Sequence, residues 1–152
     1  MTTWNESALN KLNMFSRGLV GDFDGSVLSS HFNEISKCVR QNNTDDIENW
    51  VTSVGFEAAR WLDQNGMWDV PKLQEILVAK QLDYGHENIM AFGIIGVGIR
   101  VCDKIARYYN LVNRPDEAEN EPFVDCLVDM VGYAVIARML QDDTFLLDLE
   151  GR

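Results

Sequence analysis

Helical periodicity of the apolar residues is the feature that most constrains the fold of this chain. Over residues 44–64, apolar side chains recur three or four positions apart, which gathers them on one face of a helix. Comparable patterns predict helices over 7–19, 26–41, 69–82, 88–111 and 121–141. The three prolines, at positions 71, 115 and 122, lie at the edges of such segments. Because no alternating run typical of a strand occurs, we expect an all-α bundle of about five to six helices.

The length and charge of the chain narrow its organisation and its partners. With 152 residues it can form one domain with a hydrophobic core, so we expect a single domain over 1–152. The formal net charge of −11 argues against nucleic acid as a partner, since basic residues supply much of the affinity for phosphate backbones. A small anionic ligand would need a local cluster of basic residues.

Cysteine, histidine and hydropathy patterns indicate a cytoplasmic protein. Cys38, Cys102 and Cys126 stand far apart without a C-x-x-C pair, and only two histidines occur. This pattern argues against zinc and disulfides and for a reducing compartment. The first residues lack the basic start and apolar run of a signal peptide. No stretch reaches the roughly 18 apolar residues of a membrane span, so we expect no membrane as a partner.

The segment 88–111 is apolar around most of its circumference. The exception is a charged seam whose spacings of three, four and seven place its members on one face: Arg100, Asp103, Lys104 and Arg107. A helix that is apolar around most of its circumference lies deep in a bundle or at a subunit contact. Together with the similarly apolar segment that follows, it predicts a homo-oligomer, either a dimer or a tetramer.

The segment 121–141 carries three carboxylates spaced four apart on one face: Glu121, Asp125 and Asp129. Carboxylates so placed repel one another and need a partner that stabilises their charged form. In the structural interpretation, the basic residues of the preceding seam neutralise them in an interhelical ladder of ion pairs. In the functional one, the carboxylates bind Mg²⁺ while the basic residues bind the phosphates of a nucleotide. The sequence leaves both interpretations open.

The stretch "KQLDYGHEN" at 80–88 joins two predicted helices and is rich in polar groups. Gly85 would allow a tight turn with positive φ, and the next helix would begin with N–H groups that suit an anion. The pair Tyr84-Gly85 is equally compatible with an ordinary helix end that has an aromatic ring packed behind it.

As part of a site, this stretch offers both charge and hydrogen bonds. Lys80 can neutralise a phosphate, and Asp83 or Glu87 can join a metal shell. Tyr84 can stack on a base, and Asn88 can hydrogen-bond to the base or the sugar.

These patterns together resemble a known protein family. Three motifs occur in order: K-x-x-D-Y-G-x-x-N from Lys80, R-x-x-D-K-x-x-R from Arg100, and E-x-x-x-D-x-x-x-D-x-x-x-Y from Glu121. They resemble the nucleotide-modification-associated domain of phage and bacterial proteins, which is grouped with the MazG-like all-α nucleoside triphosphate pyrophosphohydrolases. The resemblance covers about residues 75–140. The N-terminal helices over 1–70 have no assigned role.

The resemblance implies an oligomeric α-helical core that cleaves a (deoxy)nucleoside triphosphate to the monophosphate and pyrophosphate, using Mg²⁺ or Mn²⁺. Carried onto this chain, it implies a metal held by Asp125 and Asp129, assisted by Glu121 and by Asp103, Asp83 or Glu87. Phosphate contacts would come from Lys80, Arg100, Lys104 and Arg107, and base or sugar contacts from Tyr84, Asn88 and Tyr133. A phage-encoded protein of this kind would act in the host cytoplasm.

One family feature has no counterpart here. MazG-like enzymes usually carry an E-x-x-E pair on an earlier helix, whereas Glu57 and Glu75 are single acids. This departure favours a second hypothesis, a non-catalytic protein that sequesters or senses a nucleotide or a nucleotide-derived signal. In a third hypothesis the charged seams only hold the bundle together. Lys104→Met would then cost stability and change no ligand affinity.

Overall fold

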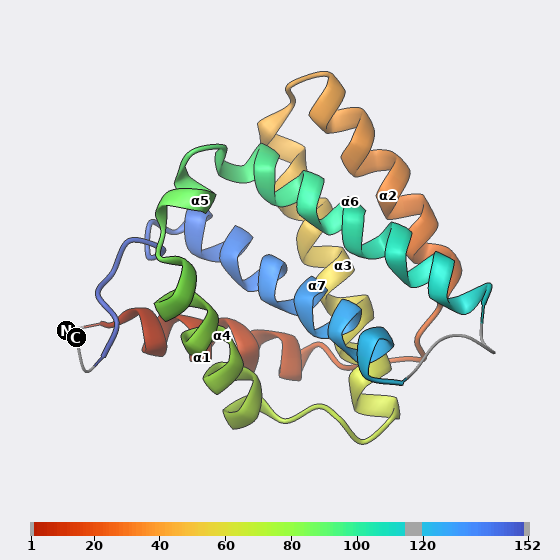
Figure 1. Cartoon of the computed structure of the whole chain (residues 1–152), viewed down its shortest axis with the longest axis horizontal. Coiled ribbons are helices and arrows are strands. Elements are labelled where there is room, and N and C mark those ends of the chain that lie inside the picture. Colours follow the sequence, from red (N-terminus) through yellow and green to blue (C-terminus); the bar gives the residue numbers. More distant parts are fainter. Residues whose placement is uncertain (1, 115–119, 151–152) are drawn as a thin grey trace.

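The computed structural model describes residues 2–114 and 120–150, apart from the side chains of residues 120–122. Within this part, the chain forms seven helices and no strand (Figure 1). In chain order they are α1 (Trp4–Arg17), α2 (Gly25–Arg40), α3 (Thr44–Gln64), α4 (Val70–Tyr84), α5 (Glu87–Met90), α6 (Gly93–Val112) and α7 (Asn120–Gln141). The prediction of an all-α fold is confirmed, but the helices outnumber those expected.

The additional helix arises because the segment predicted as one helix over 88–111 is two, α5 and α6. Gly93 begins α6 with φ of +59°, a conformation that residues with a side chain rarely adopt. The apolar pattern continues across the break, since Ile89 is buried and Ile94 packs against the same core. Periodicity alone therefore did not reveal the interruption.

Local sequence explains where several helices begin and end. A capping box starts α1, in which Thr3 and Glu6 each accept a hydrogen bond from the backbone N–H of the other. Asp24 and Asp69 cap α2 and α4, because each side chain accepts a backbone N–H of the first turn. Gly85 ends α4 with φ of +68°, which turns the chain sharply towards α5.

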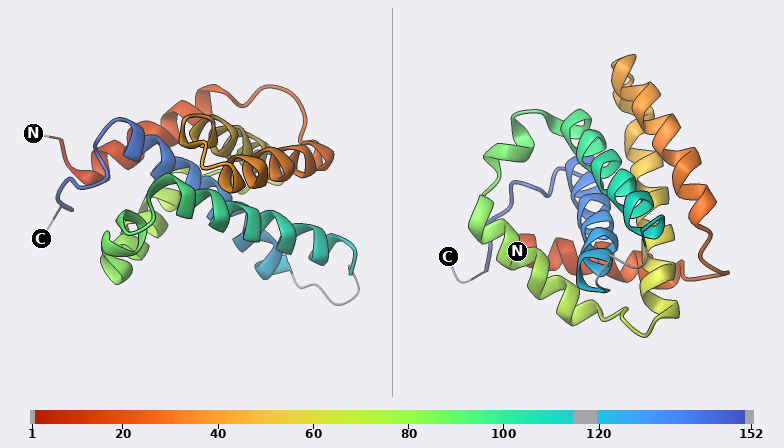
Figure 2. Two further views of the ribbon diagram at one scale, coloured as in Figure 1. Left: turned by 90° about the horizontal axis from the view of Figure 1, so that it is seen from above. Right: turned by 45° about the vertical axis from the view of Figure 1, so that its right-hand side comes forward.

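The α3 and α7 helices form the central pair of the bundle (Figures 1 and 2). The α6 helix packs on both of them, and α2 packs on α3 and α6. On the other side of the central pair, α1 contacts α7, α3 and α4. Buried residues from all seven described helices form one hydrophobic cluster. No helix in the described ranges combines the length and apolar character that a membrane crossing requires.

A glycine allows α3 and α7 to pack closely. A Cβ atom at Gly55 would lie 2.4 Å from the Cβ atom of Ala134 and 2.9 Å from the ring of Phe15. Gly55→Ala is therefore expected to lower the free energy of unfolding by about 1–3 kcal/mol through overpacking. Urea unfolding measures this loss, and Asn49→Ala on the exposed side of α3 is the control. A Gly55→Ala variant as stable as the wild type would contradict the close packing.

The face of α6 that enters the core is the predicted stripe, since Val97, Val101, Ile105 and Tyr108 are all buried. The opposite face is more open than the sequence suggested, because Ile99 is 48% exposed. The apolar circumference of α6 is thus only partly covered by its own chain.

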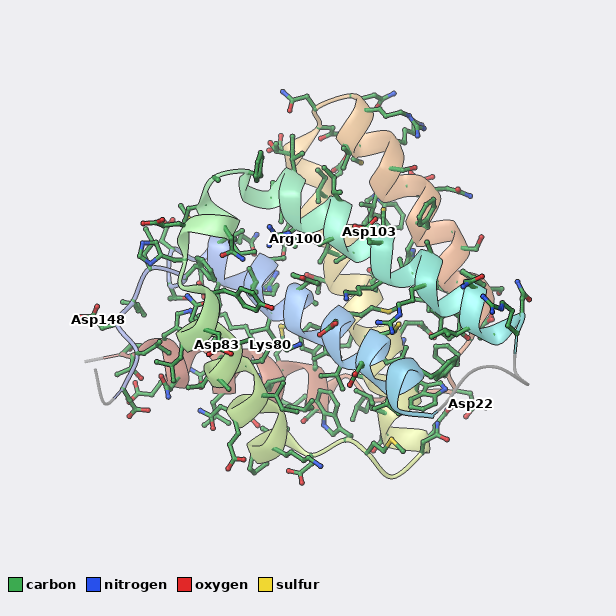
Figure 3. The ribbon with its side chains drawn as sticks, viewed as in Figure 1. Asp22, Lys80, Asp83, Arg100, Asp103 and Asp148 are labelled. Atoms are coloured by element: carbon green, nitrogen blue, oxygen red, sulfur yellow. The ribbon has the colours of Figure 1, made fainter. Side chains whose placement is uncertain are left out.

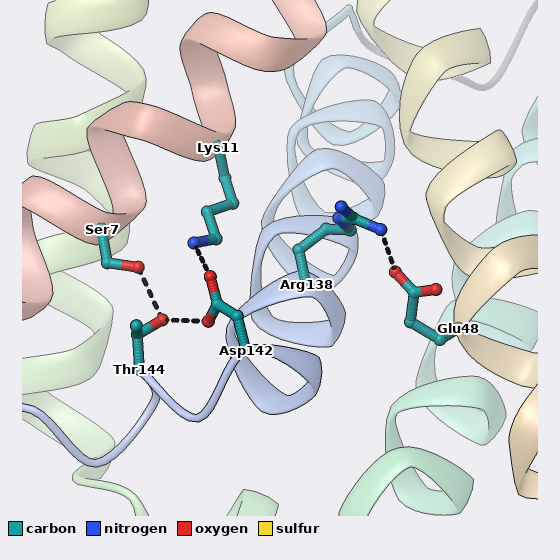
Figure 4. Close-up of polar contacts among 6 residues, drawn as sticks. All are labelled: Ser7, Lys11, Glu48, Arg138, Asp142 and Thr144. Atoms are coloured by element: carbon teal, nitrogen blue, oxygen red, sulfur yellow. Dashed lines mark hydrogen bonds and ion pairs between the residues drawn. The ribbon is translucent and has the colours of Figure 1, made fainter.

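A partly buried ion pair joins α7 to α3 (Figure 4). Arg138 Nη1 lies 2.9 Å from Oε1 of Glu48, and the Thr52 hydroxyl donates to the same carboxylate. Glu48 is only 7% exposed. Because a buried carboxylate needs a counter-charge, Arg138 stabilises the position of α7 on α3.

A second ion pair fixes the chain after α7 to α1 (Figure 4). Asp142 accepts hydrogen bonds from Lys11 and Thr144, and the Thr144 hydroxyl also bonds to that of Ser7. Burial acts to raise the pKa of the Asp142 carboxyl, but the hydrogen bonds outweigh it and hold the pKa below its ordinary value. This pairing contributes stability above the unfolded-state pKa, and the contribution is lost as the pH falls through the lowered value.

The α4 helix is attached to the bundle mainly through α1, and α5 mainly through α6. Only Leu73 and Leu77 of α4 are buried. Leu77 also reaches α7, where a Cβ atom at Gly132 would lie 2.9 Å from its methyl group. The two helices thus span from α1 to α6 beside α7 (Figure 1).

Candidate functional site

A pocket of about 340 Å³ lies between α4 and α5 on one side and α6 and α7 on the other. Six of the seven predicted substrate contacts line it, together with one predicted metal ligand: Lys80, Tyr84, Asn88, Arg100, Lys104, Tyr133 and Asp129. The apolar part of its wall consists of Trp4, Ile76, Leu77, Ile89, Val128 and Ile136. All three sequence motifs therefore contribute residues to one pocket.

The charged groups of this pocket come from three helices. Lys80 belongs to α4 and Arg100 to α6 (Figure 3). Lys104 follows Arg100 by one turn of α6. Asp129 of α7 is the one carboxylate that the described residues contribute to the pocket wall. The described wall thus has an excess of two positive charges, in a chain whose formal net charge is −11.

Asp129 pairs with both lysines of the pocket. Its Oδ2 lies 2.9 Å from Lys104 Nζ, and its Oδ1 accepts a hydrogen bond from Lys80. The Asp129 side chain is 16% exposed and that of Lys104 is 25% exposed. These are interhelical ion pairs of the kind that the structural interpretation of the sequence expects.

The surroundings of Lys104 keep its side chain charged. Burial acts to lower the pKa of its ammonium group, but the hydrogen bond and the charge of Asp129 outweigh burial and raise the pKa above its ordinary value. The ion pair therefore contributes stability below the unfolded-state pKa of Lys104, and this is lost as the pH rises through the higher folded value. At neutral pH, Lys104 is a cation at the pocket wall.

The turn after α4 builds the side of the pocket nearest α5. Arg100 Nη2 lies 3.4 Å from the backbone carbonyl of Asn88, which links α5 to α6. The side-chain Oδ1 of Asn88 is buried and has no hydrogen-bond partner within the described residues. Tyr84, the last residue of α4, is 70% exposed, so a ligand in the pocket can reach its ring.

Five further predicted site residues, all with described side chains, do not line the pocket and are exposed: Asp83, Glu87, Asp103, Arg107 and Asp125. Figure 3 shows Asp83 on α4 and Asp103 on α6. The seam on α6 divides because Arg100 and Lys104, four residues apart, share a helix face that meets α7. Arg107 lies at almost the same angle around the helix as Arg100 but seven residues further along α6, away from the pocket, whereas Asp103 lies further round the helix on its exposed side.

The described side chains do not assemble three or more ligands for a resident Mg²⁺ ion. Among them, no group of three or more His, Cys, Asp or Glu residues is close enough to hold a metal. Mg²⁺ prefers several oxygen ligands, whereas Asp129 is engaged by two lysines. The side chain of Glu121 lies outside the described residues, so the predicted magnesium site, with Mn²⁺ as its alternative, stays a prediction.

A second pocket of similar volume lies along α2 and α3, but its charge differs. Its wall contains one cation, Lys37, against two carboxylates, Glu34 and Asp46. Such a wall repels a phosphate, so the pocket around Asp129 is the better candidate for an anionic ligand.

Sequence reasoning missed the apolar residues of the pocket wall, among them Trp4. A tryptophan at the start of an amphipathic helix is typical of a core residue, and Trp4 is indeed only 1% exposed. Its indole Nε1 is nevertheless without a hydrogen-bond partner in the described part of the chain. Only the packing of α1 against α4 and α7 brings Trp4 to this pocket.

The comparisons with protein families, with curated proteins and with solved structures gave no match to this chain. The candidate site therefore rests on its own geometry and charge.

Proposed function

We propose that this pocket binds a phosphorylated small molecule of about nucleotide size. The observation that carries the proposal is the convergence of Lys80, Arg100 and Lys104 on one pocket of an acidic chain. Lysine and arginine form charge-assisted hydrogen bonds with phosphate oxygens. The volume of about 340 Å³ lies within the range of small-molecule pockets.

The uncharged part of the wall supports a ligand that is larger than phosphate itself. Tyr84 offers an accessible ring for stacking, and the apolar side chains of Leu77 and Ile136 suit a flat heterocycle. A protein that binds such a ligand without cleaving it would sequester or sense a nucleotide. This function needs no metal ligand beyond the residues that line the pocket.

A second candidate function is the cleavage of a (deoxy)nucleoside triphosphate to the monophosphate and pyrophosphate. It is favoured by Asp129 in the pocket wall and by Asp125 one turn earlier on α7. We place it second because the described carboxylates do not form a metal site. A homo-oligomeric state and a cytoplasmic location belong to the same proposal and rest on sequence patterns. A role in phage nucleotide metabolism rests on the family resemblance alone.

The direct test titrates the protein with pyrophosphate and with a panel of ribo- and deoxynucleoside triphosphates, in Mg²⁺ and in EDTA. Calorimetry and thermal shift measure binding, while phosphate and pyrophosphate release measure turnover. Binding without release would support a nucleotide-binding protein, and metal-dependent pyrophosphate release would establish the second candidate. If no ligand in the panel binds and none is cleaved, both functions are wrong.

Asp129→Asn separates the two candidates. Because Asp129 neutralises the lysines that a phosphate would contact, removing its charge is expected to tighten pyrophosphate binding about fivefold in EDTA. If Asp129 instead serves pyrophosphate release, the same change abolishes turnover. Asp63→Asn, at an exposed position on α3 outside the pocket wall, is the matched control. Weaker pyrophosphate binding by Asp129→Asn in EDTA would contradict the competition between Asp129 and phosphate.

A further inference from the structure

The segment between α4 and α6 forms one side of the pocket and is attached to the rest of the chain by few groups (Figure 1). Its helix α5 has four residues, of which Ile89 is the one that is buried. Arg100 Nη2 lies 3.4 Å from the Asn88 carbonyl oxygen, which is longer than an ordinary hydrogen bond. The backbone N–H groups of Met90 and Ala91 donate to carbonyl groups within the segment itself. The segment can therefore move as one unit.

A glycine with positive φ stands at each end of this segment. Gly85 has φ of +68° and ψ of −159°, a combination that is nearly restricted to glycine. Gly93 has φ of +59°. A Cβ atom at either position would meet nothing within 4 Å, so backbone conformation and not crowding accounts for the glycines. Residues that absorb large changes of φ and ψ at both ends of a short segment are typical of a hinged element.

The position of the segment against the pocket carries an unfavourable contribution that movement would remove. The side-chain Oδ1 of Asn88 is buried and has no hydrogen-bond partner among the described residues. Buried polar groups are nearly always hydrogen-bonded, and lifting the segment would expose this atom to water. The opposing cost is the exposure of Ile89, which is buried in the structure. With a single buried side chain as its anchor, the segment opens at a much lower free energy than the whole fold.

We propose that residues 85–93 are a hinged lid that opens to admit the ring of the ligand and then closes over it. This inference rests on the proposed phosphate-binding function of the pocket. The Lys80 side chain is 49% exposed, so phosphate reaches the cations while the lid is closed. The apolar wall is covered, since Leu77 is 7% exposed and Ile89 is 4% exposed. Lid opening therefore limits the binding rates of a nucleotide but not those of pyrophosphate.

Gly93→Ala tests the lid, because Gly93 does not line the pocket and alanine disfavours a positive φ. The change destabilises the closed lid equally in the free and in the ligand-bound protein. Association and dissociation of the tightest-binding nucleoside triphosphate are both expected to become about tenfold faster, with an unchanged Kd. The rates for pyrophosphate should stay the same. Stopped-flow tryptophan fluorescence measures both pairs of rates.

Hydrogen exchange tests the lid without any ligand. In the wild type, the Met90 and Ala91 amides should exchange through an opening that low urea concentrations do not promote. The Val101 and Ile105 amides of α6 should instead exchange through urea-dependent global unfolding. Gly93→Ala should speed the exchange of the α5 amides about tenfold. Wild-type α5 amides that exchange only through global unfolding would overturn the lid, even if Gly93→Ala does not fold.

Gly21→Ala is the matched control. Gly21 also has a positive φ, of +83°, and open space around its Cα atom, but it lies between α1 and α2 and does not line the pocket. The change should lower the urea midpoint through the same backbone strain and leave α5 exchange and all ligand rates unaltered.

The outcomes separate this inference from the function on which it rests. Faster α5 exchange together with faster nucleotide binding and release supports the lid. Faster exchange with unchanged nucleotide rates shows a segment that moves without controlling access, and this overturns the inference, as does α5 exchange that Gly93→Ala leaves unaltered. If the wild type binds pyrophosphate but no nucleotide, the lid is wrong while the phosphate-binding function stands. If the wild type binds neither, both fail.

Discussion

Lys104→Met is expected to weaken the binding of pyrophosphate and of nucleoside triphosphates about 50-fold, which corresponds to one charge-assisted hydrogen bond in a partly buried site. Lys104 is three-quarters buried, and its raised pKa keeps it charged. Methionine retains most of the apolar stem, so packing is preserved. The unfolding free energy should change by less than about 1 kcal/mol, because Asp129 keeps Lys80 as its partner.

Lys72→Met is the control for this change. Lys72 is exposed on α4 and does not line the pocket. Each of the two variants removes one positive charge, so they alter the net charge equally. Calorimetric titration should show wild-type affinity for Lys72→Met. If Lys104→Met lowers stability and leaves every affinity unchanged, the charged groups only hold the bundle together, and the proposed function fails.

Arg138→Met is expected to lower the free energy of unfolding by about 3 kcal/mol at neutral pH, because it leaves the buried Glu48 carboxylate without its counter-charge. The Thr52 hydroxyl remains as a donor but supplies no charge. Urea unfolding followed by circular dichroism measures the change. Ligand affinity should be unaffected in the folded fraction, since Arg138 does not line the pocket.

The double variant Glu48→Gln with Arg138→Met shows whether the loss of stability comes from the unpaired charge of the Glu48 carboxylate. It should recover most of the stability, because no buried carboxylate remains. The Nε of Arg138 has no partner within the described residues, so the pair is not fully satisfied even in the wild type. An equally unstable double variant would mean that Arg138 acts through packing.

The helices followed from periodicity because each buries one face in a common core. Apolar spacing placed Val97, Val101 and Ile105 on one side of α6, and this stripe is buried. The break before Gly93 escaped prediction, since a positive φ at one residue leaves the apolar pattern intact on both sides. Hydrophobic pattern reports which side chains are buried but not every turn of the backbone.

The gathering of Lys80, Arg100 and Asp129 could be anticipated because motif spacing places such groups on helix faces that meet. The division of the α6 seam could not be anticipated, since it depends on how α6 is rotated against α7 and on which part of its length faces the pocket. Glu57 is one of the two single acids that were compared with the E-x-x-E pair of MazG-like enzymes. It is buried and accepts hydrogen bonds from the Asp24 N–H and from Arg60. Its role in this structure is to hold the start of α2.

The attachment of α4 has a consequence for local opening of the chain. This helix packs mainly on α1, buries only Leu73 and Leu77, and carries Lys80 to the pocket. Segments with few buried contacts detach at a lower free energy than the whole fold. A ligand bridging Lys80 and Lys104 would tie α4 to α6 and raise the free energy of this detachment by its own binding free energy. A bound ligand would therefore slow the exchange of the α4 amide hydrogens with solvent.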